Sequence, residues 1–259
     1  MNKEVFYSVI MSVYNDQDNI EASIKSILSQ SFNNFEFIII DDGSTDDSLN
    51  IIKSYVKVDN RIKFYSNVIN LGLTKSLNHA IEKSKGVWLV RQDSDDISLP
   101  NRLKDAYEAI NCNHFDFYST PAILFGKNKM TKIVPNKLTR SFFDVGFLKF
   151  KNCLVHGTLI IKKSVLKKVF YNENFIYSQD FKLYHDLINK GFILFYNKSS
   201  ISYKLRVHEK SLTQINRLEQ LNYFNKVLIE NNLPIFKNSL KGRLMNKILE
   251  IKLILKKLF

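Results

Sequence analysis

The chain reads Val87-Trp88-Leu89-Val90-Arg91-Gln92-Asp93-Ser94-Asp95-Asp96 where a short apolar run meets three carboxylates within four residues. The apolar run predicts a buried strand, and open α/β sheets bind ligands just beyond the carboxyl ends of such strands. Side chains two residues apart in an extended segment face the same way, so Asp93 and Asp95 can share one divalent cation, Mg²⁺ or Mn²⁺. The alternative is a solvated acidic turn that caps a helix beginning near Pro100.

Around this stretch, apolar strands alternate with helices of 3.6-residue apolar period. This order indicates an α/β fold with a mostly parallel central sheet, flanked by helices and joined by right-handed crossovers. Ser44 or Thr45 is expected to cap the helix after the second strand. The predicted strands are 6–13, 35–40, 62–65 and 87–90, and the predicted helices lie at 20–28, after 45, at 73–81, from about 100, and near 178–189.

The length of 259 residues and the 45% apolar content fit one globular domain. The pattern loosens after about residue 113 without a Pro/Gly-rich linker, so we expect one domain, 1–236, with halves 1–112 and 113–236. Cys112 and Cys153 match no metal or disulfide pattern, which favours a reducing cytoplasm. We find no signal-peptide pattern and no apolar run of roughly 18–20 residues, and we expect a soluble or peripheral protein.

The formal charge of +13 is concentrated partly at the C-terminus, residues 237–259. Leu240, Leu244, Ile248 and Ile251 recur at helical spacing, with lysines off this stripe. A basic amphipathic helix of this kind is typical of binding to an anionic membrane surface. The alternative is a C-terminal helical extension that packs on the domain or on another subunit. No nucleic-acid-binding motif is present, so we expect no nucleic-acid partner.

A second acidic pair, Asp41-Asp42, follows the strand 35–40 and belongs to the same predicted sheet edge. An acidic residue at this position can bind a ribose hydroxyl. The loop after the first strand, residues 12–17, lacks Gly-x-Gly-x-x-Gly, and the chain lacks a P-loop, which argues against NAD and against P-loop nucleotide binding. Carboxylates for the nucleoside and a metal for the diphosphate therefore predict a nucleotide-diphosphate donor.

Four motifs in this order resemble glycosyltransferase family 2, strongly over residues 5–105 and more loosely to about 212. They are Ser8–Asn15, Phe35–Ser44, Asn70–Asn78, and Arg91–Asp96 with Pro100 and Arg102. The resemblance implies the GT-A fold, a Rossmann-like arrangement, and inverting transfer of a sugar from a nucleotide-diphosphate sugar. It assigns residues 1–112 to the nucleotide sugar and residues 113–236 to the acceptor.

The resemblance also implies the donor site. Asp93 and Asp95 match the metal-binding Asp-x-Asp pair. Lys75 is expected near the diphosphate, with a solvated helix lysine as the alternative. The remaining residues expected to bind the nucleotide sugar, a UDP-sugar in most such enzymes, are Val13, Tyr14, Asn15, Asp41, Asp42, Arg91, Asp93 and Arg206.

On the acceptor side, Ser178-Gln179-Asp180 resembles the family's acidic pair at the start of a helix. Asp180 is the expected catalytic base, and the alternative is a first-turn residue stabilised by the helix dipole. Gln179 stands where the family usually has Glu, and it is expected to position the acceptor. His208 is expected to contact the metal or diphosphate. His156 is expected to line the acceptor pocket, with a structural histidine as the alternative.

The processive members of the family carry Gln-x-x-Arg-Trp and several membrane spans. Neither is present here, so the resemblance implies transfer of one sugar, with galactose or glucose favoured. Together with the basic tail, it predicts a polyprenyl-linked acceptor at the inner face of the cell membrane, in capsule, lipopolysaccharide O-antigen or exopolysaccharide synthesis. The alternatives are a catalytically silent sugar-nucleotide-binding scaffold and a nucleotidyltransferase.

Overall fold

The computed structural model describes residues 4–126, 132–136, 145–149, 151–208 and 217–233. Its main sheet has seven strands in the order β10-β6-β9-β4-β1-β2-β3. Only β9 is antiparallel to its neighbours, so the predicted mostly parallel α/β sheet is confirmed. The strands are β1 (Tyr7–Val13), β2 (Phe35–Asp41), β3 (Ile62–Ser66), β4 (Trp88–Arg91), β6 (Phe117–Ser119), β9 (Ile160–Lys162) and β10 (Leu194–Tyr196).

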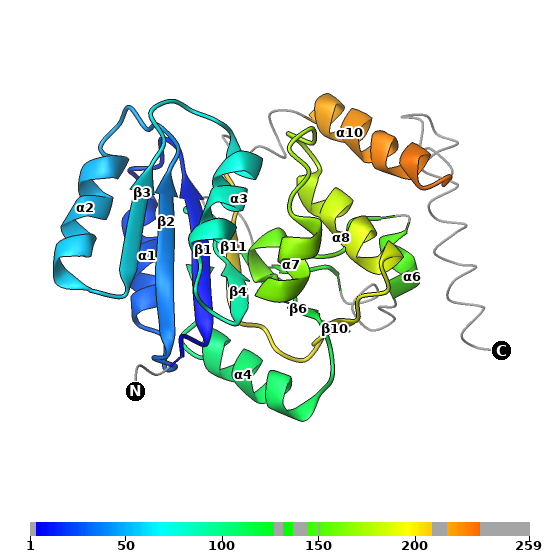
Figure 1. The fold of residues 1–259 in the computed structure, drawn as a ribbon, viewed down its shortest axis with the longest axis horizontal. Coiled ribbons are helices and arrows are strands. Elements are labelled where there is room, and N and C mark those ends of the chain that lie inside the picture. Colours follow the sequence, from blue (N-terminus) through cyan, green and yellow to red (C-terminus); the bar gives the residue numbers. More distant parts are fainter. Residues whose placement is uncertain (1–3, 127–131, 137–144, 150, 209–216, 234–259) are drawn as a thin grey trace.

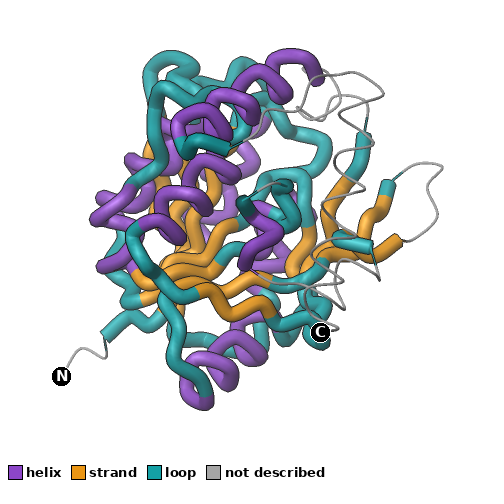
Figure 2. The backbone as a smooth tube through the Cα atoms, turned by 90° about the vertical axis from the view of Figure 1, so that its right-hand side faces the viewer, coloured by secondary structure: helices purple, strands orange, loops and turns teal. Residues whose placement is uncertain are grey.

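Helices cover both faces of this sheet (Figures 1 and 2). Successive residues of β1 point to opposite faces, so Val9 and Met11 pack with one helix layer and Ile10 packs with the other. The first layer is α1 (Ile20–Leu28), α2 (Ser48–Val58) and α4 (Arg102–Cys112). The second layer is α3 (Leu73–Lys83), α7 (Lys163–Val169) and α8 (Gln179–Asn189).

A second sheet, which the sequence pattern did not predict, has the order β5-β11-β7-β8. Because β5 follows the acidic loop directly, its pairing with β11 brings Arg206 and the following residues to that loop. The strands are β5 (Ile97–Ser98), β7 (Ala122–Phe125), β8 (Lys132–Val134) and β11 (Tyr203–Arg206). The remaining described elements are α6 (Val145–Leu148), the 3₁₀ helix η1 (His156–Thr158) and α10 (Arg217–Glu230).

The predicted strands and helices of the first half are confirmed to within a few residues, but the predicted helix cap is wrong. Helix α2 begins at Ser48 with Asp47 at its N-cap, rather than after Ser44 or Thr45. Those two residues hold the loop after β1 instead. The predicted tail helix, 237–259, lies outside the described residues. In the part of the chain that the structure describes, no helix has the length and apolar character needed to span a bilayer.

Candidate functional site: carboxylate-rich loops at the sheet edge

The backbone conformation of the acidic loop after β4 is held by hydrogen bonds from Gln92, whose side chain is fully buried. Its amide nitrogen donates to Ser23 Oγ at 2.9 Å and to the carbonyl of Asp96 at 3.0 Å. Its amide oxygen accepts from Ser98 Oγ at 2.7 Å and from Arg102 Nη1 at 3.0 Å. A fully satisfied buried polar group of this kind specifies one backbone path, so the loop presents its carboxylates in a fixed arrangement.

Each aspartate of this loop has a different neighbour. Asp93 forms an ion pair with the buried Arg91 guanidinium. Asp95 Oδ2 lies 2.9 Å from His208 Nε2, so His208, the predicted metal or diphosphate contact, lies beside the second aspartate of the pair. Asp96 is fully buried, and its Oδ1 accepts from the backbone N–H of Arg206 at 2.6 Å.

The carboxylates crowd one another. Desolvation and the negative charge of Asp93 raise the pKa of Asp95, and Asp16 from the loop after β1 acts in the same direction. Burial, together with Asp95 and Asp93, raises the pKa of Asp96 well above its usual range. Asp16 also accepts a hydrogen bond from Ser94 Oγ at 2.6 Å, so the two loops are joined. A bound cation would relieve this repulsion.

The possible metal ligands in this loop suit a hard divalent cation, because they are the carboxylate oxygens of Asp93 and Asp95 with the His208 imidazole nearby. Within the described ranges, no three acidic, histidine or cysteine side chains are close enough to form a closed cage. Mg²⁺ is commonly held by one or two carboxylates together with the phosphates of a substrate. Asp93 and Asp95 are the residues that would hold such an ion here.

The loop after β1 is held against the loop after β2. Asn15, in the left-handed region at φ 49°, accepts the N–H of Thr45 with its side-chain oxygen at 2.8 Å, and its own N–H donates to Ser44 Oγ at 3.1 Å. Val13 is buried in the sheet, whereas the Tyr14 side chain is 48% exposed beside it. Of these three predicted nucleoside contacts, Tyr14 therefore presents an open aromatic surface.

Asp41 and Asp42 are both buried, and both are hydrogen-bonded within the protein. Asp42 accepts from the backbone N–H groups of Leu71 at 2.9 Å and Gly72 at 2.8 Å, and from Asn67 Nδ2 at 2.7 Å. Asp41 accepts from Ser66 Oγ at 3.1 Å and from the N–H of Ser44 at 3.3 Å. These carboxylates therefore hold the neighbouring loops at this edge of the sheet in place.

Two predicted basic residues lie at different depths. Lys75, in the first turn of α3, is exposed. Arg206 lies against the acidic loop: its Nε donates to the carbonyl of Asp95 at 2.7 Å, and its guanidinium is 4.5 Å from the centre of the Phe125 ring. Arg206 thus supports the Asp-x-Asp backbone as well as adding positive charge beside the acidic loop.

The predicted base, Asp180, lies in the first turn of α8. Its Oδ1 accepts from the N–H of Phe181 at 2.8 Å, and its Oδ2 accepts from Asn152 Nδ2 at 2.7 Å. Ser178, the N-cap residue in the left-handed region, donates through its hydroxyl to the carbonyl of Gln220 in α10 at 3.0 Å. Gln179 is the first residue of the helix and is half-buried.

His156, at the start of η1, contacts Tyr171. Its Nε2 lies 2.7 Å from the hydroxyl of Tyr171. Desolvation and the Arg91 guanidinium lower the pKa of His156 to about 4, against opposing contributions from Asp180 and Asp93. The ring is therefore neutral at neutral pH. The same three charged groups act on the Tyr171 hydroxyl, so the predicted base and the first aspartate of the pair share one electrostatic environment.

Arg102 connects the end of β4 to η1 by hydrogen bonds. Its Nη2 donates to the carbonyl of Arg91 at 2.8 Å and to the carbonyl of Gly157 at 2.6 Å. A Cβ atom at Gly157 would lie 2.2 Å from the buried Tyr203 hydroxyl, so glycine is favoured at this position. No sequence motif points to Asp16, Asn152, Tyr171 or Tyr203, because the residues they contact lie elsewhere in the chain.

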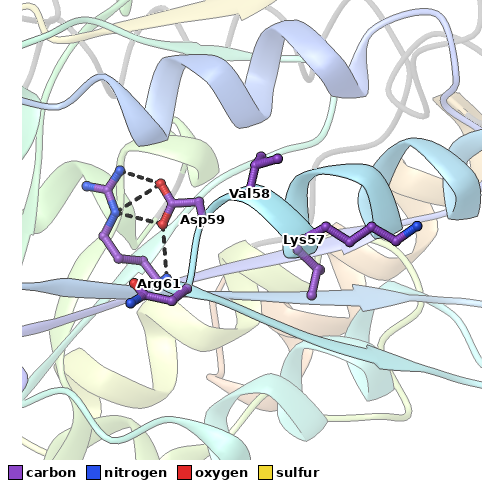
Figure 3. Close-up of a pocket in the computed structure, with 6 residues that line it drawn as sticks. Lys57, Val58, Asp59 and Arg61 are labelled. Atoms are coloured by element: carbon purple, nitrogen blue, oxygen red, sulfur yellow. Dashed lines mark hydrogen bonds and ion pairs between the residues drawn. The ribbon is translucent and has the colours of Figure 1, made fainter.

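A separate pocket lies at the turn between α2 and β3, lined by residues 56–61, where Arg61 pairs with Asp59 at 2.7 Å (Figure 3). This turn leads into the start of β3. It therefore lies at the amino ends of the parallel strands, whereas Asp41 and Asp93 lie at their carboxyl ends. It contains none of the predicted site residues.

Comparisons with known proteins point to one family. The family model "Glycosyl transferase family 2" matches residues 8–185. The O-antigen biosynthesis glycosyltransferase WbnJ of Escherichia coli is 36% identical over 215 residues, covering 79% of this chain and 80% of WbnJ. The E. coli UDP-Glc:alpha-D-GlcNAc-diphosphoundecaprenol beta-1,3-glucosyltransferase WfgD is 27% identical over 217 residues, covering 83% and 81%.

Among solved structures, the mannosyltransferase PcManGT from Pyrobaculum calidifontis, in complex with GDP-Man and Mn²⁺, superposes with a TM-score of 0.70 at 15% identity. The match covers 89% of this chain and 65% of that one. At this identity the likeness concerns the fold, and it confirms the predicted GT-A arrangement.

Proposed function

This chain belongs to glycosyl transferase family 2 and is a glycosyltransferase, and we propose that it moves one hexose from a UDP-sugar to a lipid-linked saccharide with inversion at the anomeric carbon. The observation that carries the proposal is that both predicted acidic groups are held in place: Arg91 pairs with Asp93, and Asn152 Nδ2 donates to Asp180 Oδ2 at 2.7 Å. A base and a diphosphate-binding group held in fixed positions are what a single displacement requires.

In the proposed reaction, the Asp180 carboxylate takes the proton of the acceptor hydroxyl as that oxygen attacks the anomeric carbon. The bond from the anomeric carbon to the diphosphate oxygen breaks, and its electron pair leaves with the nucleoside diphosphate. A divalent cation bound at Asp93 and Asp95 would neutralise the charge that develops on this leaving group. Arg91 holds Asp93 in place, and the neutral His156 adds no positive charge next to the base.

The donor and the acceptor classes are supported by the relatives. WfgD is named for UDP-Glc and a diphosphoundecaprenol-linked acceptor, and WbnJ is named for O-antigen biosynthesis. We assign this chain to the same kind of cell-surface polysaccharide assembly, with glucose or galactose as the sugar. Its basic residues 237–259 would hold it at the anionic inner face of the membrane.

The proposal is tested with a panel of UDP-, GDP- and dTDP-sugars, MnCl₂, and polyprenyl-diphosphate-linked N-acetylglucosamine as acceptor. Asp180→Asn is expected to lower kcat by about 10²–10⁴-fold while donor affinity is unchanged, because the amide cannot accept the proton but keeps the shape of the side chain. Asp186→Asn, on the same helix, is the control. Full turnover by Asp180→Asn would remove this aspartate from the chemistry.

A further inference from the structure

The helix that carries the predicted base, α8, packs against α10, which lies beyond the residues 8–185 that match the family model (Figure 1). The contact forms a small apolar cluster of its own, apart from the two clusters that fill the faces of the main sheet. Its buried members are Phe175, Phe181, Val227 and Leu228, and Tyr223, Phe224 and Leu233 pack against them. The start of α8 therefore has a second set of packing partners besides the main core.

One residue of α8 joins this packing to the carboxylate of the predicted base. The fully buried Phe181 ring stacks on the Phe224 ring of α10, with 4.3 Å between the ring centres and 12° between the planes. The backbone N–H of Phe181 donates to Asp180 Oδ1 at 2.8 Å. Because the ring and this N–H belong to one residue, a shift of the ring also moves the donor. The stack on Phe224 thus limits the positions open to the Asp180 carboxylate.

The chain before Asp180 is also held by α10. Ser178, the N-cap of α8, has φ 50° and ψ 27°, in the left-handed region that serine rarely adopts. Its hydroxyl caps no backbone N–H of the described helix residues 179–189 and donates instead to the carbonyl of Gln220 in α10 at 3.0 Å. A strained backbone persists where its surroundings enforce it, and such residues cluster at functional sites. Contacts to α10 therefore lie two residues before Asp180 and one residue after it.

The segment that leads into α8 is held from a second direction by α3. The Phe175 carbonyl accepts from Thr74 Oγ1 at 3.1 Å, and the Phe175 ring lies 5.8 Å from the ring of Tyr223 in α10. Helix α3 follows Gly72, whose N–H donates to Asp42 at the sheet edge. The start of α8 thus contacts both α10 and the helix that follows the loop held by Asp42.

We propose that α10 positions the base for the transfer reaction. Phe224 is the positioning residue that acts through Phe181, and Ser178 is a second anchor that acts through Gln220. With both contacts in place, the first turn of α8 holds the Asp180 carboxylate where it can take the proton of the acceptor hydroxyl. Without the Phe224 ring, this turn samples other positions, and fewer of them suit proton transfer. This assignment rests on the proposed glycosyl transfer.

The first test asks whether Phe224 acts through Asp180. Phe224→Ala is expected to lower kcat at least 10-fold with the KM of the UDP-sugar unchanged, because Asp93 and Asp95 lie outside this cluster. In the Asp180→Asn background the same substitution should lower kcat less than about 2-fold, since the base is already lost. A loss of equal size in both backgrounds would make α10 a purely structural element and overturn the proposal.

Two further variants control for loss of packing. Phe195→Ala also removes one stacked ring, 5.3 Å from Phe115 on the opposite face of the sheet from α8, and should keep the kcat of wild type. Ser178→Gly removes only the hydroxyl that bonds to Gln220, because glycine adopts the left-handed region readily. It should lower kcat about 3-fold or more. Equal losses in Phe195→Ala and Phe224→Ala, or wild-type kcat in Ser178→Gly, would contradict these roles.

A third readout does not depend on turnover. Hydrogen exchange of the Phe181 amide, followed by NMR, should become at least 10-fold faster in Phe224→Ala relative to the amides of β1, and should be unchanged in Phe195→Ala. Unchanged exchange in Phe224→Ala would overturn the positioning contact even if sugar transfer is confirmed. Absence of sugar transfer by wild type, with the exchange difference intact, would instead overturn the proposed function.

Discussion

Two acidic loops lie on the same edge of the sheet, one after β2 and one after β4, and their carboxylates have opposite surroundings. Asp42 is buried and accepts three hydrogen bonds from Leu71, Gly72 and Asn67. Asp95 lies among other carboxylates, and the charge of Asp93 adds to desolvation in raising its pKa. Asp42 of the first loop has its hydrogen-bond donors within the protein, whereas the second loop has an excess of negative charge. Similar sequence motifs thus have different surroundings: the carboxylates of the first loop hold neighbouring loops together, and those of the second are the ones proposed to bind a cation.

The largest expected effect follows from removing one charge of the second loop. Asp95→Asn should lower kcat/KM for the UDP-sugar by about 10³-fold, roughly 4 kcal/mol, because the leaving diphosphate loses its cation. The fold should be intact, since the side chain keeps its shape. Steady-state kinetics across a MnCl₂ titration checks this, with the exposed Asp47→Asn as control. Wild-type turnover by Asp95→Asn would end the metal assignment.

The corresponding change in the first loop should act on stability. In Asp42→Asn, the NH₂ group of the new amide must face at least one of the three N–H donors that Asp42 now accepts. We expect a loss of about 1–3 kcal/mol in the free energy of unfolding, measured by urea denaturation. Mn²⁺ affinity should stay close to that of wild type. A stable Asp42→Asn protein with impaired Mn²⁺ binding would reverse the two roles.

A smaller effect concerns pH. Because the folded-state pKa of Asp95 is raised above the usual 3.8, its contribution to stability is present at low pH and is lost as the pH rises through the folded-state value. In EDTA at pH 7.5, Asp95→Asn should therefore unfold at the same temperature as wild type or at a higher one, and the difference should shrink toward pH 4. MnCl₂ should raise the Tm of wild type at pH 7.5 more than at pH 5.

Thermal unfolding scans of both proteins, with and without metal, measure this dependence. A wild type more stable than Asp95→Asn in EDTA at pH 7.5 would show that the carboxylates of the second loop do not repel one another.

Most of the fold follows from local patterns, and most of the site does not. The strand 35–40 and the helix face of Ile20, Ile24 and Ile27 depend on periodicity within a few residues, so they were predicted within a few residues of their bounds. The cap of α2 was misassigned because Ser44 and Thr45 bond to Asn15 rather than to the helix.

Contacts between residues far apart in the chain could not be predicted from a single sequence. The second sheet aligns Lys204 with Ile97, and Arg206 reaches Asp95 across 111 positions. The motif resemblance selected Asp93, Asp95 and Asp180, but it carried no information on Asn152 or on the internal hydrogen bonds of Asp42. Asp42 and its partners lie within the first half of the chain, and Asn152 and Asp180 lie within the second, so these contacts depend on how each half folds on itself.

The central claim is that the loop after β4 binds a cation for a nucleotide diphosphate, and calorimetric titration of UDP into the protein tests it most directly. The titration is run with wild type, Asp95→Asn and Asp47→Asn, each in MnCl₂ and in EDTA. We expect Mn²⁺ to strengthen UDP binding at least 10-fold in wild type and Asp47→Asn, and not in Asp95→Asn. Equal UDP affinity with and without Mn²⁺ in wild type would contradict it.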